Sequence, residues 1–254
     1  MNFKFNMPVI TALAASASLA LWTSPSEADL RDYLLNQGYS TAERGEFEVE
    51  TFNDLHLHRA NHSDTYASNH EVELEYGLTD HFQLAGYAVW AWEQGAPVAY
   101  DQWKAEVKYR LADAGTLPLD LAVYLEYANQ NGSPPDDSDT VEGKVILSKD
   151  WRQWNATVNL VAEKQIQHAS AAAFEWTAGL NYGWTPRLST GLELQETLGT
   201  RHDFGLHRTE HELYLMPTIG WSPTPHSKIL IGPAFGLTRA TDDVQIRTMV
   251  AIEF

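Results

Sequence analysis

A two-residue alternation of polar and apolar side chains runs through this chain from about residue 46 to its end. It is clearest at residues 46–50, 71–75 and 104–108, where charged residues alternate with Phe, Val, Leu and Ala. Such alternation predicts β-strands with one apolar and one charged face. We expect twelve strands, with the approximate spans 46–58, 69–77, 81–93, 100–111, 117–129, 141–148, 153–165, 173–183, 188–200, 209–220, 226–238 and 243–254.

The connections between these segments alternate between turns and longer polar loops. Short turns are expected at 77–80, 149–152, 184–187 and 221–225, and longer loops at 59–68, 130–140 and 201–208. An even number of strands with short turns at one end is typical of a transmembrane barrel, whose closure pairs every backbone group. We therefore predict an all-β chain whose residues 46–254 form a single closed antiparallel up-and-down transmembrane β-barrel of about 12 strands. A periplasmic β-protein without a membrane role is the alternative.

The N-terminus has the pattern of a cleaved signal peptide, predicted at residues 1–28. Lys4 precedes an uncharged, mostly apolar run from Pro8 to Trp22, and Ser26 and Ala28 suit a cleavage site after residue 28. The run falls short of the ~20 apolar residues of a comfortable membrane helix, although a signal anchor is the alternative. Residues 29–45 are expected to form either an N-terminal periplasmic arm or a short plug helix.

The charge balance excludes several classes of function. The chain has 17 Lys and Arg against 34 Asp and Glu, a net charge of −17, so we expect no nucleic-acid partner. It has no cysteine, which excludes disulfides, thiolate metal sites and thiol catalysis. Glycine-rich nucleotide-binding motifs are absent as well, so we expect no cofactor.

The inward, polar face of the predicted barrel is mostly acidic. The residues expected to line the lumen are Glu46, Glu48, Glu50, Glu71, Glu73, Glu75, Lys104, Glu106, Lys108, Arg110, Glu126 and Arg247. Carboxylates on paired strands repel, so this face needs water, cations or basic partners, and Arg31 and Arg44 of the N-terminal arm are within reach in sequence. Acidic rings favour cations in an open pore. The alternative is a filled barrel in which Glu, Lys and Arg form an internal network.

Two histidine patterns in the sequence could indicate a metal site or an enzyme. We predict neither. His56 and His58 share a strand face near His70, which is a conceivable metal site, but solvated loop histidines explain the pattern more simply. The spacing of His168 and Ser170, two residues apart, resembles that of the catalytic His and Ser of twelve-stranded outer-membrane phospholipases. The Asn-Gly that follows in that family is missing here, so we predict that the chain is not an enzyme.

Two stretches carry a resemblance to a known family. Residues 44–50 and 73–84 resemble an uncharacterised family of Gram-negative outer-membrane β-barrels, and they are loosely similar to barrels assigned to phenol-degradation pathways. A last strand that ends in Phe254 resembles the signal read by the barrel-assembly machinery. The resemblance implies the bacterial outer membrane as the location and a barrel as the fold, and it carries no catalytic residues. We expect a monomer with outer-membrane lipids as its neighbours.

These observations predict a narrow porin-like channel. Small solutes would pass through, or bind in, an acidic lumen that prefers cations. A plugged structural or partner-binding barrel that acts through its extracellular loops is the alternative, and a lipid-modifying enzyme is a third.

Overall fold

The computed structural model describes residues 30–57, 66–130, 138–166, 171–200, 202–205 and 211–254. The predicted signal peptide, His58, His168 and Ser170 lie outside the described residues. No helix long and apolar enough to cross a membrane occurs in the described part of the chain.

The described chain forms twelve long β-strands and one two-residue strand. They are β1 (Phe47–Leu57), β2 (Tyr66–Thr79), β3 (Phe82–Glu93), β4 (Ala99–Arg110), β5 (Asp120–Gln130), β6 (Thr140–Trp151), β7 (Trp154–Gln165), β8 (Ala173–Thr185), β9 (Leu188–Thr200), the short β10 (Asp203–Phe204), β11 (Leu213–Thr224), β12 (Ser227–Gly236) and β13 (Val244–Glu253). The expected number of strands is confirmed, and their ends differ from the expected ones by a few residues. The short β10, which pairs with the end of β9, is not among the expected strands.

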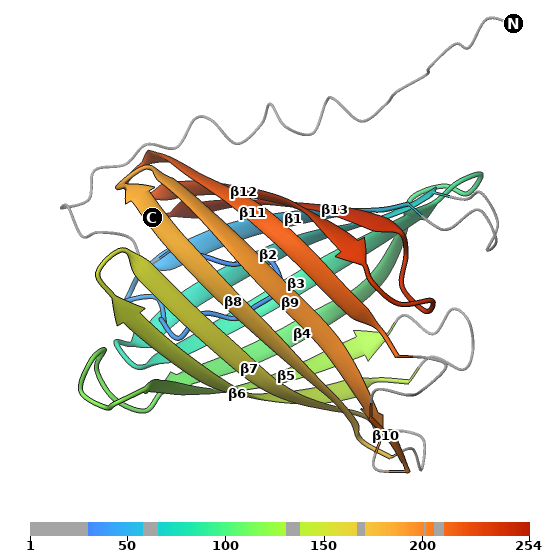
Figure 1. Cartoon of the computed structure of the whole chain (residues 1–254), viewed down its shortest axis with the longest axis horizontal. Coiled ribbons are helices and arrows are strands. Elements are labelled where there is room, and N and C mark those ends of the chain that lie inside the picture. Colours follow the sequence, from blue (N-terminus) through green and yellow to red (C-terminus); the bar gives the residue numbers. More distant parts are fainter. Residues whose placement is uncertain (1–29, 58–65, 131–137, 167–170, 201, 206–210) are drawn as a thin grey trace, which may run out of the picture.

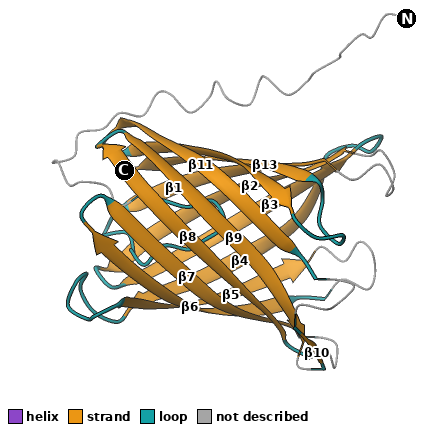
Figure 2. Ribbon diagram, viewed as in Figure 1, coloured by secondary structure: helices purple, strands orange, loops and turns teal. Residues whose placement is uncertain are grey.

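The strands close into one antiparallel barrel, as Figures 1 and 2 show. Each long strand pairs with its neighbours in the chain, and β13 pairs with β1 to complete the ring. At the seam, Phe254 and Phe47 exchange backbone hydrogen bonds of 2.8 and 3.3 Å. Closure leaves no long strand with a free edge, which is the condition a β-structure must meet in lipid. The predicted fold class is confirmed.

The apolar face of the barrel points outward. Leu74 is 57% exposed, whereas its neighbours Glu73 and Glu75 are 0% and 5% exposed. Leu125 and Leu160 are likewise exposed, at 52% and 51%, at the middle of their strands. A soluble β-protein would bury these leucines and expose the acids, so the pattern agrees with an outer surface that faces lipid.

Short turns and aromatic side chains mark one end of the barrel. Two residues separate β2 from β3, β6 from β7, β8 from β9 and β11 from β12, and the start of β1 and the end of β13 lie at this same end. Exposed aromatics gather there: Phe47, Tyr109, Trp151, Trp154, Trp184 and Trp221. Tyr66, Tyr100, Trp103 and Phe204 are exposed toward the other end. Two aromatic belts with an aliphatic band between them are typical of transmembrane barrels.

Candidate functional site

Residues 30–42, which we name the lumen segment, enter the barrel from the short-turn end and contact opposite walls. Arg31 reaches carboxylates of β1 and β2, while Gln37 reaches Asn159 of β7. Residues 30–45 contain no helix, so the segment differs in form from the expected short helix, and it lies in the lumen rather than forming a free arm. Strands on both sides therefore hold a bent, non-helical peptide inside the barrel.

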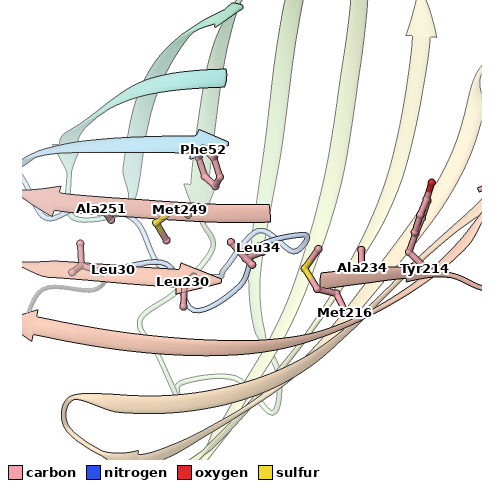
Figure 3. Close-up of a cluster of buried hydrophobic side chains, with 9 residues drawn as sticks. All are labelled: Leu30, Leu34, Phe52, Tyr214, Met216, Leu230, Ala234, Met249 and Ala251. Carbon is pink, nitrogen blue, oxygen red and sulfur yellow. The ribbon is translucent and has the colours of Figure 1, made fainter. Parts of the chain in front are cut away.

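Apolar packing holds one side of the segment. Leu30 and Leu34 are 8% and 1% exposed. Figure 3 shows them among inward side chains of β1, β11, β12 and β13. These are Phe52, Tyr214, Met216, Leu230, Ala234, Met249 and Ala251. Strict alternation predicted a polar inner face throughout, but this sector of the wall is apolar because it packs against the segment.

Glu193 of β9 holds the middle of the segment by its backbone. Its carboxylate accepts hydrogen bonds from the backbone N–H groups of Leu34, Leu35 and Asn36 at 2.8, 2.8 and 3.0 Å. The Asn36 side-chain amide donates a further bond at 3.0 Å. Glu193 is fully buried. Bonds to an ionised acceptor are roughly twice as strong as neutral ones, so this carboxylate is the main polar anchor of the segment.

Uncharged polar side chains of β7 and β8 complete this contact. The Tyr33 hydroxyl donates to the backbone carbonyl of Asn155 at 3.0 Å. Gln37 donates its backbone N–H to Asn159 at 2.7 Å and accepts from the same side chain at 3.0 Å. Thr177 donates to the Asn36 side chain at 2.6 Å. This docking face was not predicted from the sequence, although a signal for it is present. The inward positions here are Asn and Thr, where other strands carry charges.

Arg31 carries the segment's charge into the acidic hairpin of β1 and β2. Its guanidinium nitrogens lie 3.1 Å from Glu50, 3.5 Å from Glu73 and 3.8 Å from Glu75. Burial opposes the charge of this side chain, but the three carboxylates outweigh it and raise the pKa of Arg31 well above its ordinary value. Arg31 therefore stays protonated, and its charge is held inside the barrel. Arg44, in contrast, is exposed at the rim.

Glu48, Glu106 and Lys108 extend the same cluster. All three are at most 5% exposed, and the Tyr87 hydroxyl donates a hydrogen bond to Glu106. A small cavity of about 20 Å³ adjoins Glu48, Glu50, Glu75, Lys108 and residues of the lumen segment. That volume is enough for about one water molecule or ion.

The remaining predicted lining residues also lie on the inner face, in pairs rather than in one site. Lys104 contacts Glu71 at 3.0 Å across β3, and Arg247 contacts Asp54 at 3.3 Å across the β1–β13 pair. Glu126 accepts a hydrogen bond from Tyr124 at 2.6 Å. At the short-turn rim, Arg110 donates to the backbone of Asp80, and Glu46 accepts from the backbone of Glu43 at 3.1 Å.

The conceivable histidine metal site is not formed by the described residues. His56 points into the lumen, where its ring nitrogen lies 2.9 Å from Asp242. His70 is paired directly with Asn53 on the outer face, at 2.8 Å. His56 is paired with Ala67, three residues before His70, and an odd separation along a strand places the two rings on opposite sides of the sheet.

A larger cavity of about 250 Å³ lies beside the segment at the short-turn end. Asp32, Asn155, Arg187 and Lys228 are among the residues that line it. Lys228 forms an ion pair with Asp32, so this side of the segment is also held by charge. The cavity lies at the short-turn mouth of the barrel, and Asp32 of the lumen segment forms part of its lining.

Comparison with known proteins places this arrangement among outer-membrane barrels. No family model matches the chain, and no curated protein matches it in sequence. An outer-membrane channel from Pseudomonas putida F1 is similar in structure, with a TM-score of 0.60 and 15% identity, over 87% of this chain and 100% of that one. A KdgM porin has a TM-score of 0.57 and 8% identity, and a NanC porin 0.54 and 11%; each similarity covers 82% of this chain and 98% of the porin.

These similarities establish the fold. The chain has the architecture of small outer-membrane channel barrels, as the sequence resemblance implied. The similar structures are porins and channels rather than enzymes, which agrees with the prediction of a non-enzymatic chain. The similarity to barrels of phenol-degradation pathways stays a prediction, because similarity at this level of identity shows the fold alone.

Proposed function

We propose that the protein is a channel of the bacterial outer membrane whose pore is closed by its own lumen segment, residues 30–42, and opens when that segment is displaced. The observation that carries this proposal is the Glu193 anchor, in which one buried wall carboxylate accepts three consecutive backbone N–H bonds of the segment. The segment is not one of the hydrogen-bonded strands that form the closed ring of the barrel. The barrel therefore keeps its backbone pairing when the segment moves.

The open lumen would favour small cations. Inward carboxylates outnumber inward basic residues along the described wall. The acids include Glu48, Glu50, Asp54, Glu71, Glu73, Glu75, Glu106, Glu126, Glu142, Glu163, Glu175 and Glu193, and the bases include Lys104, Lys108, Arg110, Lys144, Lys228 and Arg247. Arg31 neutralises part of this surplus in the closed state, and its departure with the segment leaves the lumen more acidic. Acidic pore walls concentrate cations and exclude anions.

In this proposal the barrel sits in the outer membrane as a single subunit, with lipid around it. The exposed leucine band faces outer-membrane lipids, and the last strand, ending in Phe254, is the segment that the barrel-assembly machinery reads. A closed ring of twelve long strands needs no second subunit to pair its edges, so the channel acts as a monomer.

Conductance across a planar bilayer under a salt gradient tests the proposal. We expect the protein to show rare, brief openings, and a variant without residues 30–42 to conduct steadily with a cation-selective reversal potential. Heat-dependent mobility on a denaturing gel would show that both proteins are folded. If the folded deletion variant conducts no better than the full protein, the channel proposal is wrong.

The second candidate is a permanently plugged barrel that acts through its outer loops. The observation in its favour is the double attachment of the segment, by an apolar cluster on one side and by Glu193 on the other. This second candidate predicts that the full protein shows no channel openings at any voltage. It also predicts that substitutions inside the lumen leave the activity of the outer loops unchanged.

A further inference from the structure

We propose that Glu50, Glu73 and Glu75 form a calcium site for which Arg31 is an internal competitor, so that calcium binding releases the charged end of the lumen segment. The release of the segment rests on the proposed function, whereas the calcium site does not.

The strand register creates the site. Glu50 lies directly opposite Glu73, and Glu48 directly opposite Glu75, in the antiparallel pair of β1 and β2. Like charges directly opposite one another are destabilising. Glutamate at all four positions therefore costs stability in the barrel unless a cation is held between the two strands.

The charges of this buried cluster do not balance without a further cation or protons. The carboxylates of Glu48, Glu50, Glu73, Glu75 and Glu106 are each at most 5% exposed. The cations that face them among the described residues are Arg31 and Lys108. Unpaired charge is costly in a medium that water does not reach, so the excess of carboxylates demands added protons or a bound cation.

The geometry of three of these acids suits calcium. Glu50, Glu73 and Glu75 each offer a carboxylate oxygen, and these oxygens all lie within 4.8 Å of one another. Calcium binds oxygens at about 2.3–2.6 Å, so ligands on opposite sides of the ion are about 4.6–5.2 Å apart. Magnesium needs a tighter octahedron at about 2.0–2.1 Å and sheds its waters reluctantly. Oxygens within 4.8 Å of one another can bind a single calcium ion together, and the flexible coordination of calcium suits three carboxylates better than the strict octahedron of magnesium.

A second observation points to a ligand here. The side-chain oxygen of Gln37, on the lumen segment, is buried and has no hydrogen-bond donor among the described residues. Gln37 is 6% exposed and lines the same cavity of about 20 Å³ as Glu48, Glu50 and Glu75. One oxygen of Glu48 and both oxygens of Glu73 are likewise buried and accept no hydrogen bond among the described residues, although Arg31 lies 3.5 Å from one oxygen of Glu73. Gln37 and Glu48 line a space of the size of one ion, and neutral oxygens such as that of Gln37 commonly complete calcium coordination.

Arg31 and calcium exclude each other. The guanidinium contacts the same three carboxylates at 3.1, 3.5 and 3.8 Å, so an ion coordinated by them would occupy its place. Calcium therefore competes with an internal cation, which weakens its apparent affinity. Removing the guanidinium should therefore strengthen calcium binding. If Arg31 served only as a structural ion-pair partner, its removal would not raise the calcium affinity.

Calorimetric titration of the purified protein in detergent with calcium chloride tests the site. We expect Arg31→Gln to bind one calcium at least tenfold more tightly than the natural protein. Arg247→Gln is the matched control, because it removes a lumen arginine that pairs with Asp54 instead. It should leave calcium affinity unchanged. Adding Glu73→Gln to the Arg31→Gln variant should abolish the gain, with heat-dependent gel mobility as the check on folding.

Three results would overturn the proposal: equal calcium affinity in Arg31→Gln and the natural protein, an equal gain in Arg247→Gln, or magnesium binding as tight as calcium. Calcium binding is measured without reference to conductance. A barrel that binds calcium but never conducts would refute the channel and leave the site standing. A barrel that conducts but does not bind calcium would refute the calcium site and leave the channel proposal standing.

Discussion

The backbone N–H of Leu34 donates a 2.8 Å hydrogen bond to the carboxylate of Glu193, although 159 residues separate them in the chain. This contact joins the lumen segment to the wall at a position with no access to water. It gives the closed state its main backbone anchor, which mutation can weaken without changing the barrel's own strand pairing.

Glu193→Gln should open the channel. The substitution removes the charge and turns one acceptor into an amide donor that faces backbone N–H groups, which costs about 2 kcal/mol or more. A loss of that size in the closed state raises the open probability by tenfold or more, measurable as single-channel current. Glu175→Gln is the control, since that carboxylate contacts Gln195 rather than the segment. Equal currents in the two variants would contradict the anchor role.

Gly179→Ala should also favour opening, by steric means. A Cβ atom at this position in β8 would lie 2.4 Å from the Tyr33 ring and 3.0 Å from the Asn36 side chain. The segment must move away from the wall to relieve such overlap. Gly183→Ala lies on the same strand, and its Cβ would meet nothing nearer than a backbone oxygen at 3.9 Å. More frequent openings in the first variant alone are expected in bilayer recordings.

Cation selectivity should depend on the acids beyond the segment. Replacing Glu126 and Glu163 with Gln, in the variant without residues 30–42, should shift the reversal potential toward zero because two negative charges leave the wall. Lys104→Gln in the same background should shift it in the opposite direction. Reversal potentials that remain the same in both variants would show that these side chains do not set selectivity.

Leu125→Arg should destabilise the barrel in lipid. Leu125 is exposed at the middle of β5, where a charge would face the centre of the bilayer. An arginine at that depth costs about 2–4 kcal/mol, and one near the interface about 0–1 kcal/mol. Leu119→Arg, just before β5 at the short-turn end, supplies the shallow comparison. Denaturant unfolding from lipid vesicles measures both, and equal losses would argue against a lipid-facing band.

Several features of the barrel followed directly from the sequence. Alternation has a period of two whatever the partner strand is, so Glu73 and Leu74 were assigned to opposite faces before any pairing was known. Closure could be inferred because an even set of such strands, apolar on the outside, leaves no free edge. The charge on Arg31 and its position ahead of the first strand also indicated a partner for the acidic hairpin, although they did not specify which carboxylates it would meet.

The filling of the lumen was decided by the tertiary structure alone. Glu193 carries no local signal that distinguishes it from Glu175, because its role depends on which residues of a distant segment face it once the ring has closed. The inward Met216 and Met249 broke the polar pattern for the same reason. Short-range periodicity determines which way a side chain points. What it meets there depends on the barrel's diameter and on the path of residues 30–42, which the closed ring of strands sets.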